Sequence, residues 1–144
     1  MTFPQTEAIR WSTVFSEDDK LKAIAKYGCL AMCYLYCIGI VSEDTIMTMQ
    51  SLKTAMEKGL LDTECTVLDA TKFMEFFAHK KYIVSKKNIT SIANIKDKTP
   101  VRYEYNGSGH WVVVENGKIV FNSLANSICV AKGKPTSARV IYYE

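Results

Sequence analysis

The chain has 144 residues, of which 48% are hydrophobic, 11% aromatic and 23% charged. This length suits one domain and the composition is that of a folded globular protein, which excludes a disordered or collagen-like chain. Eighteen Lys and Arg against fifteen Asp and Glu leave a net charge of +3, too slight a balance to indicate a nucleic-acid partner. We therefore predict a single domain over residues 1–144.

The first half of this domain, residues 16–80, is predicted to be helical. Ser16 and the acidic residues after it are typical of a helix N-terminus, and Asp69 is a second candidate cap. Gly39 and Gly59 are plausible helix ends. The apolar segment after Gly28 predicts the central, most buried helix. The four predicted helices cover residues 17–26, 29–38, 45–58 and 70–79.

The second half, residues 81–144, is predicted to be an antiparallel sheet. Short β-branched and aromatic runs alternate there with turn residues, and Asn116-Gly117 is a strong hairpin signal because both central residues of a type I′ turn need positive φ. The predicted fold class is therefore α+β, with N-terminal helices and a central Cys-bearing helix packed on a C-terminal antiparallel sheet. The predicted strands lie around residues 82–84, 101–105, 111–114, 119–121 and 140–143.

The N-terminal 15 residues lack the apolar run of a secretory signal. The most apolar stretch, residues 28–41, is shorter than the roughly 20 residues that cross a bilayer. These features predict a cytoplasmic protein with no membrane contact, in which cysteines stay reduced.

The five cysteines differ in their positions. Cys33 and Cys37, like Cys65 and Cys129, are interpreted as small buried apolar residues. Their spacing does not suit zinc, so no metal or cofactor is predicted. Cys29 begins the central helix, where unpaired amides and the positive end of the helix dipole would lower the thiol pKa and make it a nucleophile.

His110 enters a predicted strand after the flexible segment 107–109, where its imidazole could take the proton of a thiol. The returning strand supplies Asn122 and Ser123 as groups that could orient this imidazole. A two-residue Asn116-Gly117 loop pairs His110 with Ser123 and turns Asn122 to the other face. Either a bulge near Gly109 or Asn122 shifts the register in favour of Asn122, or Ser123 is the histidine partner.

The order of a Cys at a helix start, a His opening a strand after Gly, and Asn-Ser at the end of the next strand resembles papain-like cysteine peptidases, including the compact bacteriocin-leader peptidase branch. The resemblance covers about residues 27–123. It implies a papain-like fold with Cys29 as nucleophile, His110 as general base and acid, and Asn122 as the orienting residue. It further implies a small bacterial or phage thiol hydrolase that cleaves a peptide or other amide bond in a peptide or protein substrate.

An alternative hypothesis is a catalytically impaired papain-like pseudoenzyme, carried by a phage or plasmid, that acts as a protein-binding module or inhibitor. The family usually has a Gln several residues before the nucleophile, and residues 18–28 contain none. Leu30 also stands where the leader-peptidase branch favours Gly. A third hypothesis is acyl transfer, in which an amine rather than water resolves the thioester.

Overall fold

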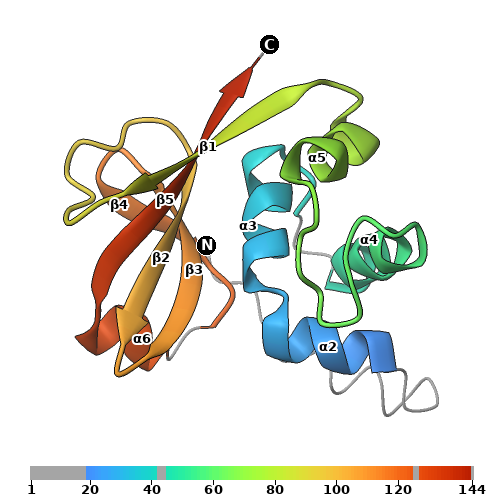
Figure 1. Ribbon diagram of the computed structural model, residues 1–144, viewed down its shortest axis with the longest axis horizontal. Helices are drawn as coiled ribbons and strands as arrows, with labels where there is room; N and C mark the ends of the chain where they lie inside the picture. Colours follow the sequence, from blue (N-terminus) through green and yellow to red (C-terminus); the bar gives the residue numbers. More distant parts are fainter. Residues whose placement is uncertain (1–18, 42–44, 125–126, 144) are drawn as a thin grey trace.

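The computed structural model describes residues 19–41, 45–124 and 127–143, and it shows the N-terminal helices on one side of a sheet (Figure 1). The predicted α+β class is confirmed, because the N-terminal helices, including the Cys-bearing helix, lie on a C-terminal five-stranded antiparallel sheet. The helices are α2 (Asp19–Tyr27), α3 (Cys29–Cys37), α4 (Thr45–Glu57), α5 (Ala70–Ala78) and α6 (Ile128–Lys132). The strands are β1 (Tyr82–Asn88), β2 (Thr99–Tyr105), β3 (Ser108–Glu115), β4 (Lys118–Asn122) and β5 (Lys134–Tyr143).

Local signals set several of these boundaries. The Asp69 carboxylate accepts a hydrogen bond from the Lys72 N–H at 3.1 Å and caps the start of α5, and His79, which directly follows α5, adopts a left-handed conformation with φ 57°. Gly39 follows α3 with φ 80°. These ends agree with the sequence predictions. The predicted cap at Ser16 lies outside the described residues.

The strand order in the sheet is β1-β5-β2-β3-β4. Strands β2, β3 and β4 follow one another as hairpins, whereas β5 returns to insert between β1 and β2. Strand β5 therefore joins β1 to the part of the sheet formed by β2, β3 and β4. Helix α3 packs on β3 and β2.

Both hairpins that contain β3 turn at an Asn-Gly pair with positive φ. The predicted turn has φ 52° at Asn116 and 73° at Gly117, and the second has φ 47° at Asn106 and 80° at Gly107. The expected flexible segment at residues 107–109 is therefore a tight turn followed by the start of β3 at Ser108. The prediction was wrong there because the Asn before Gly107 was not taken into account.

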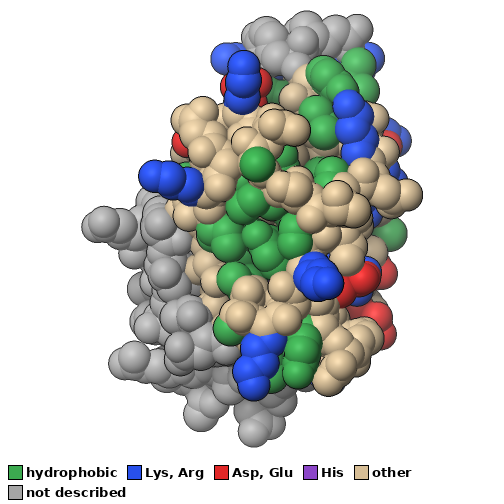
Figure 2. All heavy atoms as spheres, turned by 90° about the vertical axis from the view of Figure 1, so that its left-hand side faces the viewer, with side chains coloured by type: hydrophobic (Ala, Val, Ile, Leu, Met, Phe, Trp, Pro, Cys, Tyr) green, Lys and Arg blue, Asp and Glu red, His purple; other side chains and the backbone are tan. Residues whose placement is uncertain are grey.

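Hydrophobic side chains form two clusters, one on each face of the sheet. The larger lies between the helices and the sheet and includes Trp111, Val113 and Phe121. The smaller contains Val112 and Val114 and is covered by residues of the 89–95 segment and of α6, a helix that the sequence did not predict. On the side that faces left in Figure 1, hydrophobic side chains gather at the centre, with Lys and Arg around them (Figure 2). No helix among the described residues is long and apolar enough to cross a membrane.

Candidate active site

Cys29 lies at a kink between two helices. Gly28, which separates α2 from α3, has helical angles (φ −76°, ψ 0°), and its N–H donates to the Ile24 carbonyl at 2.9 Å. A Cβ at Gly28 would lie 2.6 Å from that carbonyl oxygen, closer than real contacts allow. Glycine at position 28 thus lets the chain bend tightly, and the bend sets the direction of α3 from its first residue, Cys29.

The Cys29 thiol is partly buried, and burial raises its pKa above the ordinary value of 9.0. Hydrogen bonds from backbone N–H groups, the largest from Trp111 and the next from Leu30, act in the opposite direction, as does the positive charge of Arg102. The prediction of a lowered thiol pKa was therefore wrong. The helix-start amides are present, but the cost of burying a thiolate outweighs them.

The remaining four cysteines are also free thiols. Burial raises the pKa of Cys33 well above its ordinary value and that of Cys37 and Cys65 to about 12. Cys33, Cys65 and Cys129 are buried, whereas Cys37 is partly exposed. Within the described residues, no group of three or more His, Cys, Asp or Glu side chains is arranged to hold a metal ion.

A β-bulge decides which side chain meets His110. The β3–β4 pairing runs from Glu115 opposite Lys118 to Val112 opposite Asn122, with a shift of one residue between Val113 and Val114. This shift places Asn122 opposite Val112, on the same face as His110 two residues earlier. The register shift proposed near Asn122 is therefore present.

His110 and Asn122 form a hydrogen bond, with 2.8 Å between the ring Nε2 and the amide Oδ1. The Leu124 backbone N–H also donates to this Oδ1, at 2.9 Å. Because an N–H can only donate, it fixes the amide orientation, and Nε2 must carry the proton in its bond to the same oxygen. Neutral His110 thus presents an unprotonated Nδ1. Burial lowers the pKa of His110 below 6.5, and the Asn122 hydrogen bond partly opposes this.

Cys29 lies against the start of β3, the part of the strand that contains His110. Strand β4 ends at Asn122 opposite Val112, so the first residues of β3 extend beyond it. Strand N–H groups lie in the plane of a sheet, so the Cys29 sulfur that accepts from Trp111 sits between the two faces. No hydrogen bond joins Cys29 to His110 in the part of the chain that the structure describes. The structure thus brings His110 and Asn122 together and puts Cys29 beside the residue that follows His110.

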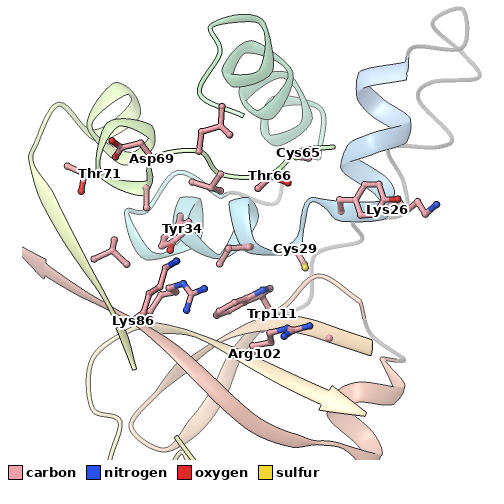
Figure 3. Close-up of a pocket in the computed structure, with 18 residues that line it drawn as sticks. Lys26, Cys29, Tyr34, Cys65, Thr66, Asp69, Thr71, Lys86, Arg102 and Trp111 are labelled. Carbon is pink, nitrogen blue, oxygen red and sulfur yellow. The ribbon is translucent and has the colours of Figure 1, made fainter. Parts of the chain in front are cut away.

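A cavity of about 630 Å³ opens next to Cys29, between the helical layer and the sheet (Figure 3). Cys29, Trp111 and Arg102 lie at one end, and Tyr34 and Lys86 at the other. None of the cavity residues contributed by the strands was predicted as a site residue from the sequence. Alternation along each strand could have shown which of its residues lie on the same face as Arg102 or Trp111. The pairing that brings strands from distant parts of the sequence together has no local signal.

Gly109 provides space for Arg102. The two residues lie on adjacent strands, and a Cβ on Gly109 would collide with the Arg102 guanidinium. That guanidinium forms an ion pair with Glu104. It also acts on the Cys29 sulfur through its charge. Gly109, which precedes His110, therefore leaves room for the Arg102 guanidinium.

The fold and the site together define a two-layer α+β protein with a cysteine at the start of its central helix and a hydrogen-bonded His-Asn pair on the adjoining sheet. The chain matches the family described as "Protein of unknown function, DUF261" over residues 13–143, and it belongs to that family. No curated protein and no solved structure matches it. These comparisons provide no link to papain-like peptidases.

Proposed function

We propose that this protein is a small thiol hydrolase of papain-like organisation, which cleaves a peptide or other amide bond. Cys29 is the nucleophile, His110 the general base and acid, and Asn122 the residue that orients the imidazole. The observation that carries the proposal is the hydrogen bond between His110 Nε2 and Asn122 Oδ1 at 2.8 Å. It holds the imidazole in the tautomer that leaves Nδ1 able to accept a proton.

The reaction begins from a neutral pair, because burial raises the pKa of Cys29 and lowers that of His110. His110 Nδ1 takes the thiol proton as the sulfur attacks the carbonyl carbon and forms a tetrahedral oxyanion. The C–N bond then breaks, and the imidazolium gives its proton to the leaving amine. Water, deprotonated by His110, hydrolyses the thioester and releases a carboxylic acid and the free thiol.

Two kinds of donor near Cys29 can stabilise the oxyanion. The Leu30 N–H lies in the first turn of α3 and, within the described residues, meets no backbone carbonyl. The Arg102 guanidinium is held close enough for its charge to act on the Cys29 sulfur. Arg102 would supply the side-chain donor that papain-like peptidases take from a Gln before the nucleophile, which the chain lacks between residues 18 and 28.

A peptidyl vinyl sulfone that alkylates active thiols tests the proposal, with the labelled residue located by mass spectrometry. We expect labelling at Cys29 in the native chain and a loss of it in Cys29→Ala. Cys37→Ala is the matched control, because Cys37 ends the same helix and should leave labelling unchanged. Equal labelling of Cys29 and Cys37 would contradict an activated Cys29.

The second candidate is a papain-like pseudoenzyme that binds another protein. The raised pKa of Cys29 and the lack of a Cys29–His110 hydrogen bond within the described residues favour it. It predicts that Cys29→Ala and His110→Ala retain the biological activity of the protein. A hydrolase loses its activity with either change.

We also propose that the protein works in the cytoplasm. All five cysteines are free thiols, as expected for a protein kept in a reducing compartment. Retention of activity in the presence of a thiol reductant, and loss of activity under mild oxidation, would support this localisation.

A further inference from the structure

Two cations face each other in the part of the cavity next to Tyr34. Lys86 on β1 and Arg139 on β5 are direct partners in the antiparallel pairing, and both line the cavity. Like charges directly opposite one another destabilise a sheet. Within the described residues, neither side chain forms a salt bridge with a carboxylate. The pair is therefore a site of positive charge that the described part of the fold leaves without a counter-charge.

The Arg139 side chain is held in place against the cavity wall. Its guanidinium carbon lies 4.7 Å from the centre of the Trp111 ring. It also hydrogen-bonds to Tyr34, which is only 2% exposed. Stacking on an aromatic ring and a hydrogen bond to a buried hydroxyl restrict the rotamers of an arginine. A ligand bound there would meet a guanidinium that is already ordered.

The rest of the cavity adds little negative charge. Its described lining contains four cationic side chains and one acidic side chain, Asp69. The Asp69 carboxylate already accepts the Lys72 N–H as the cap of α5. Glu104 neutralises Arg102 near Cys29, but it is not among the lining residues. The lining therefore carries an excess of positive charge, and the Lys86–Arg139 pair supplies two of its four cations.

A short stretch of a peptide substrate can span the distance between the Lys86–Arg139 pair and Cys29. Cys29 and Tyr34 are five residues apart on α3, which corresponds to about 7.5 Å along the helix axis. An extended peptide covers that distance in about two residues. Tyr34 and Lys86 lie together in the cavity, away from Cys29 (Figure 3).

We propose that Lys86 and Arg139 bind a carboxylate of the substrate about two residues from the bond that Cys29 attacks. The preferred substrate is thus an acidic peptide, and this inference rests on the proposed function. The carboxylate can belong to an Asp or Glu side chain or to the C-terminus of the peptide. Both sources present the same planar anion to the guanidinium.

Binding to the Cys29→Ala variant of the full chain tests this proposal without cleavage. The probes are fluorescein-labelled, alanine-based hexapeptides that carry one Glu at successive positions, the same peptides with Gln, and each with a free or amidated C-terminus. We expect at least one Glu peptide, or the free-carboxylate set, to bind about tenfold more tightly than its neutral counterpart. Equal affinity in every pair would overturn the proposal.

Lys87→Ala is the matched control for Lys86→Ala and Arg139→Gln. Lys87 follows Lys86 on β1 and lines a different cavity. The preference for the charged peptide should fall to about twofold or less in Lys86→Ala and Arg139→Gln and stay unchanged in Lys87→Ala. An equal loss in Lys87→Ala would mean that general surface charge, rather than this pair, attracts the peptide.

The melting temperature of the ligand-free protein provides a second readout that does not depend on a peptide. Lys86→Ala removes the repulsion from Arg139 and should raise the melting temperature by roughly 1–4 °C. A lower melting temperature would show that the two cations are not in conflict and would contradict the inferred site.

Failure of this inference is distinguishable from failure of the proposed hydrolase. Selective binding of acidic peptides by Cys29→Ala, with no cleavage of them by the native protein, would keep the carboxylate site and remove the hydrolase. Cleavage of Glu and Gln peptides at equal rates by the native protein would do the reverse.

Discussion

The two hairpins that share β3 use the same Asn-Gly turn but pair differently. The β2–β3 hairpin keeps one register from Tyr105 opposite Ser108 to Thr99 opposite Val114, whereas the β3–β4 hairpin shifts by one residue after Val114. The regular hairpin places Arg102 opposite Trp111 in the cavity. The shifted one brings Asn122 to the face of His110. One extra residue in β4 thus decides which polar side chains can act together.

We expect the largest effect on Cys29 alkylation from a change at His110, the proposed base, which lies on the shifted β3–β4 hairpin. His110→Ala removes the proton acceptor for Cys29, and the rate of Cys29 alkylation by the peptidyl vinyl sulfone should fall about 10³-fold or more at pH 7. The measurement is the second-order rate constant for alkylation. His79→Ala is the control and should have no effect, because His79 directly follows α5 and is not part of the candidate site. Similar rate constants in His110→Ala and the native protein would remove His110 from the mechanism.

Asn122→Ala leaves His110 in place without its orienting hydrogen bond. We expect the same rate constant to fall by about tenfold to a hundredfold, because the imidazole is no longer held in one position. The hydrogen bond favours the protonated ring, so its loss should also lower the pKa of His110 further. Nitrogen NMR of the imidazole measures both the tautomer and this pKa.

Ser123→Ala is the companion variant, since Ser123 was the alternative partner and is fully buried in the structure. It should leave the His110 tautomer unchanged. A shift of the tautomer in Ser123→Ala but not in Asn122→Ala would assign the orienting role to the serine.

Gly109→Ala perturbs the regular hairpin. The added methyl group would collide with the Arg102 guanidinium and displace it from its place near Cys29. We expect a loss of about tenfold or less in the alkylation rate, since the charge is moved but not removed. Arg102→Ala should cause at least as large a loss in the same assay. Full activity in both variants would exclude Arg102 from oxyanion stabilisation.

Protonation of buried His110 should also appear in stability. Its pKa in the folded state lies below 6.5, so the unfolded chain binds more protons as the pH falls through 6.5, and the fold loses stability there. His110→Gln should lose less stability than the native chain between pH 7.5 and 5. Thermal denaturation of both proteins across this range measures the difference, and parallel curves would contradict a buried neutral imidazole.

Deletion of Val120 is expected to have the smallest effect. Val120 is the residue passed over between Ile119, opposite Val114, and Phe121, opposite Val113, so its removal straightens β4 and keeps both pairs and the Asn122 pairing. The alkylation rate should stay within about threefold of the native value. A loss comparable to that of Asn122→Ala would show that the bulge does more than absorb one residue.

The parts of the fold that were predictable depend on neighbours in the sequence. Asp69 caps α5 through a residue three positions ahead, and the Asn116-Gly117 turn needs only its own two residues. The sequence left Asn122 and Ser123 as alternative partners of His110, because a bulge depends on how the whole strand packs against its neighbour. Lys86 and Arg139 are more than fifty residues apart, and their meeting follows from the insertion of β5 beside β1, which no local pattern predicts.

The sequence named three candidate site residues but gave the wrong electrostatics for Cys29. Cys29, His110 and Asn122 follow from motif order, and the structure places the last two in a hydrogen bond. The helix start at Cys29 predicted a low thiol pKa, yet α3 packs against β3, and the sulfur is desolvated there. Desolvation depends on tertiary packing, and the sequence around a cysteine does not reveal it.

The pH dependence of Cys29 alkylation by the peptidyl vinyl sulfone tests the central claim most directly. If His110 deprotonates Cys29 during attack, the rate should rise through an apparent pKa below 6.5, level off, and lose this acid limb in His110→Ala. A rate that rises only above pH 9, and does so equally in the native protein and in His110→Ala, would show an isolated buried thiol and contradict the proposed mechanism.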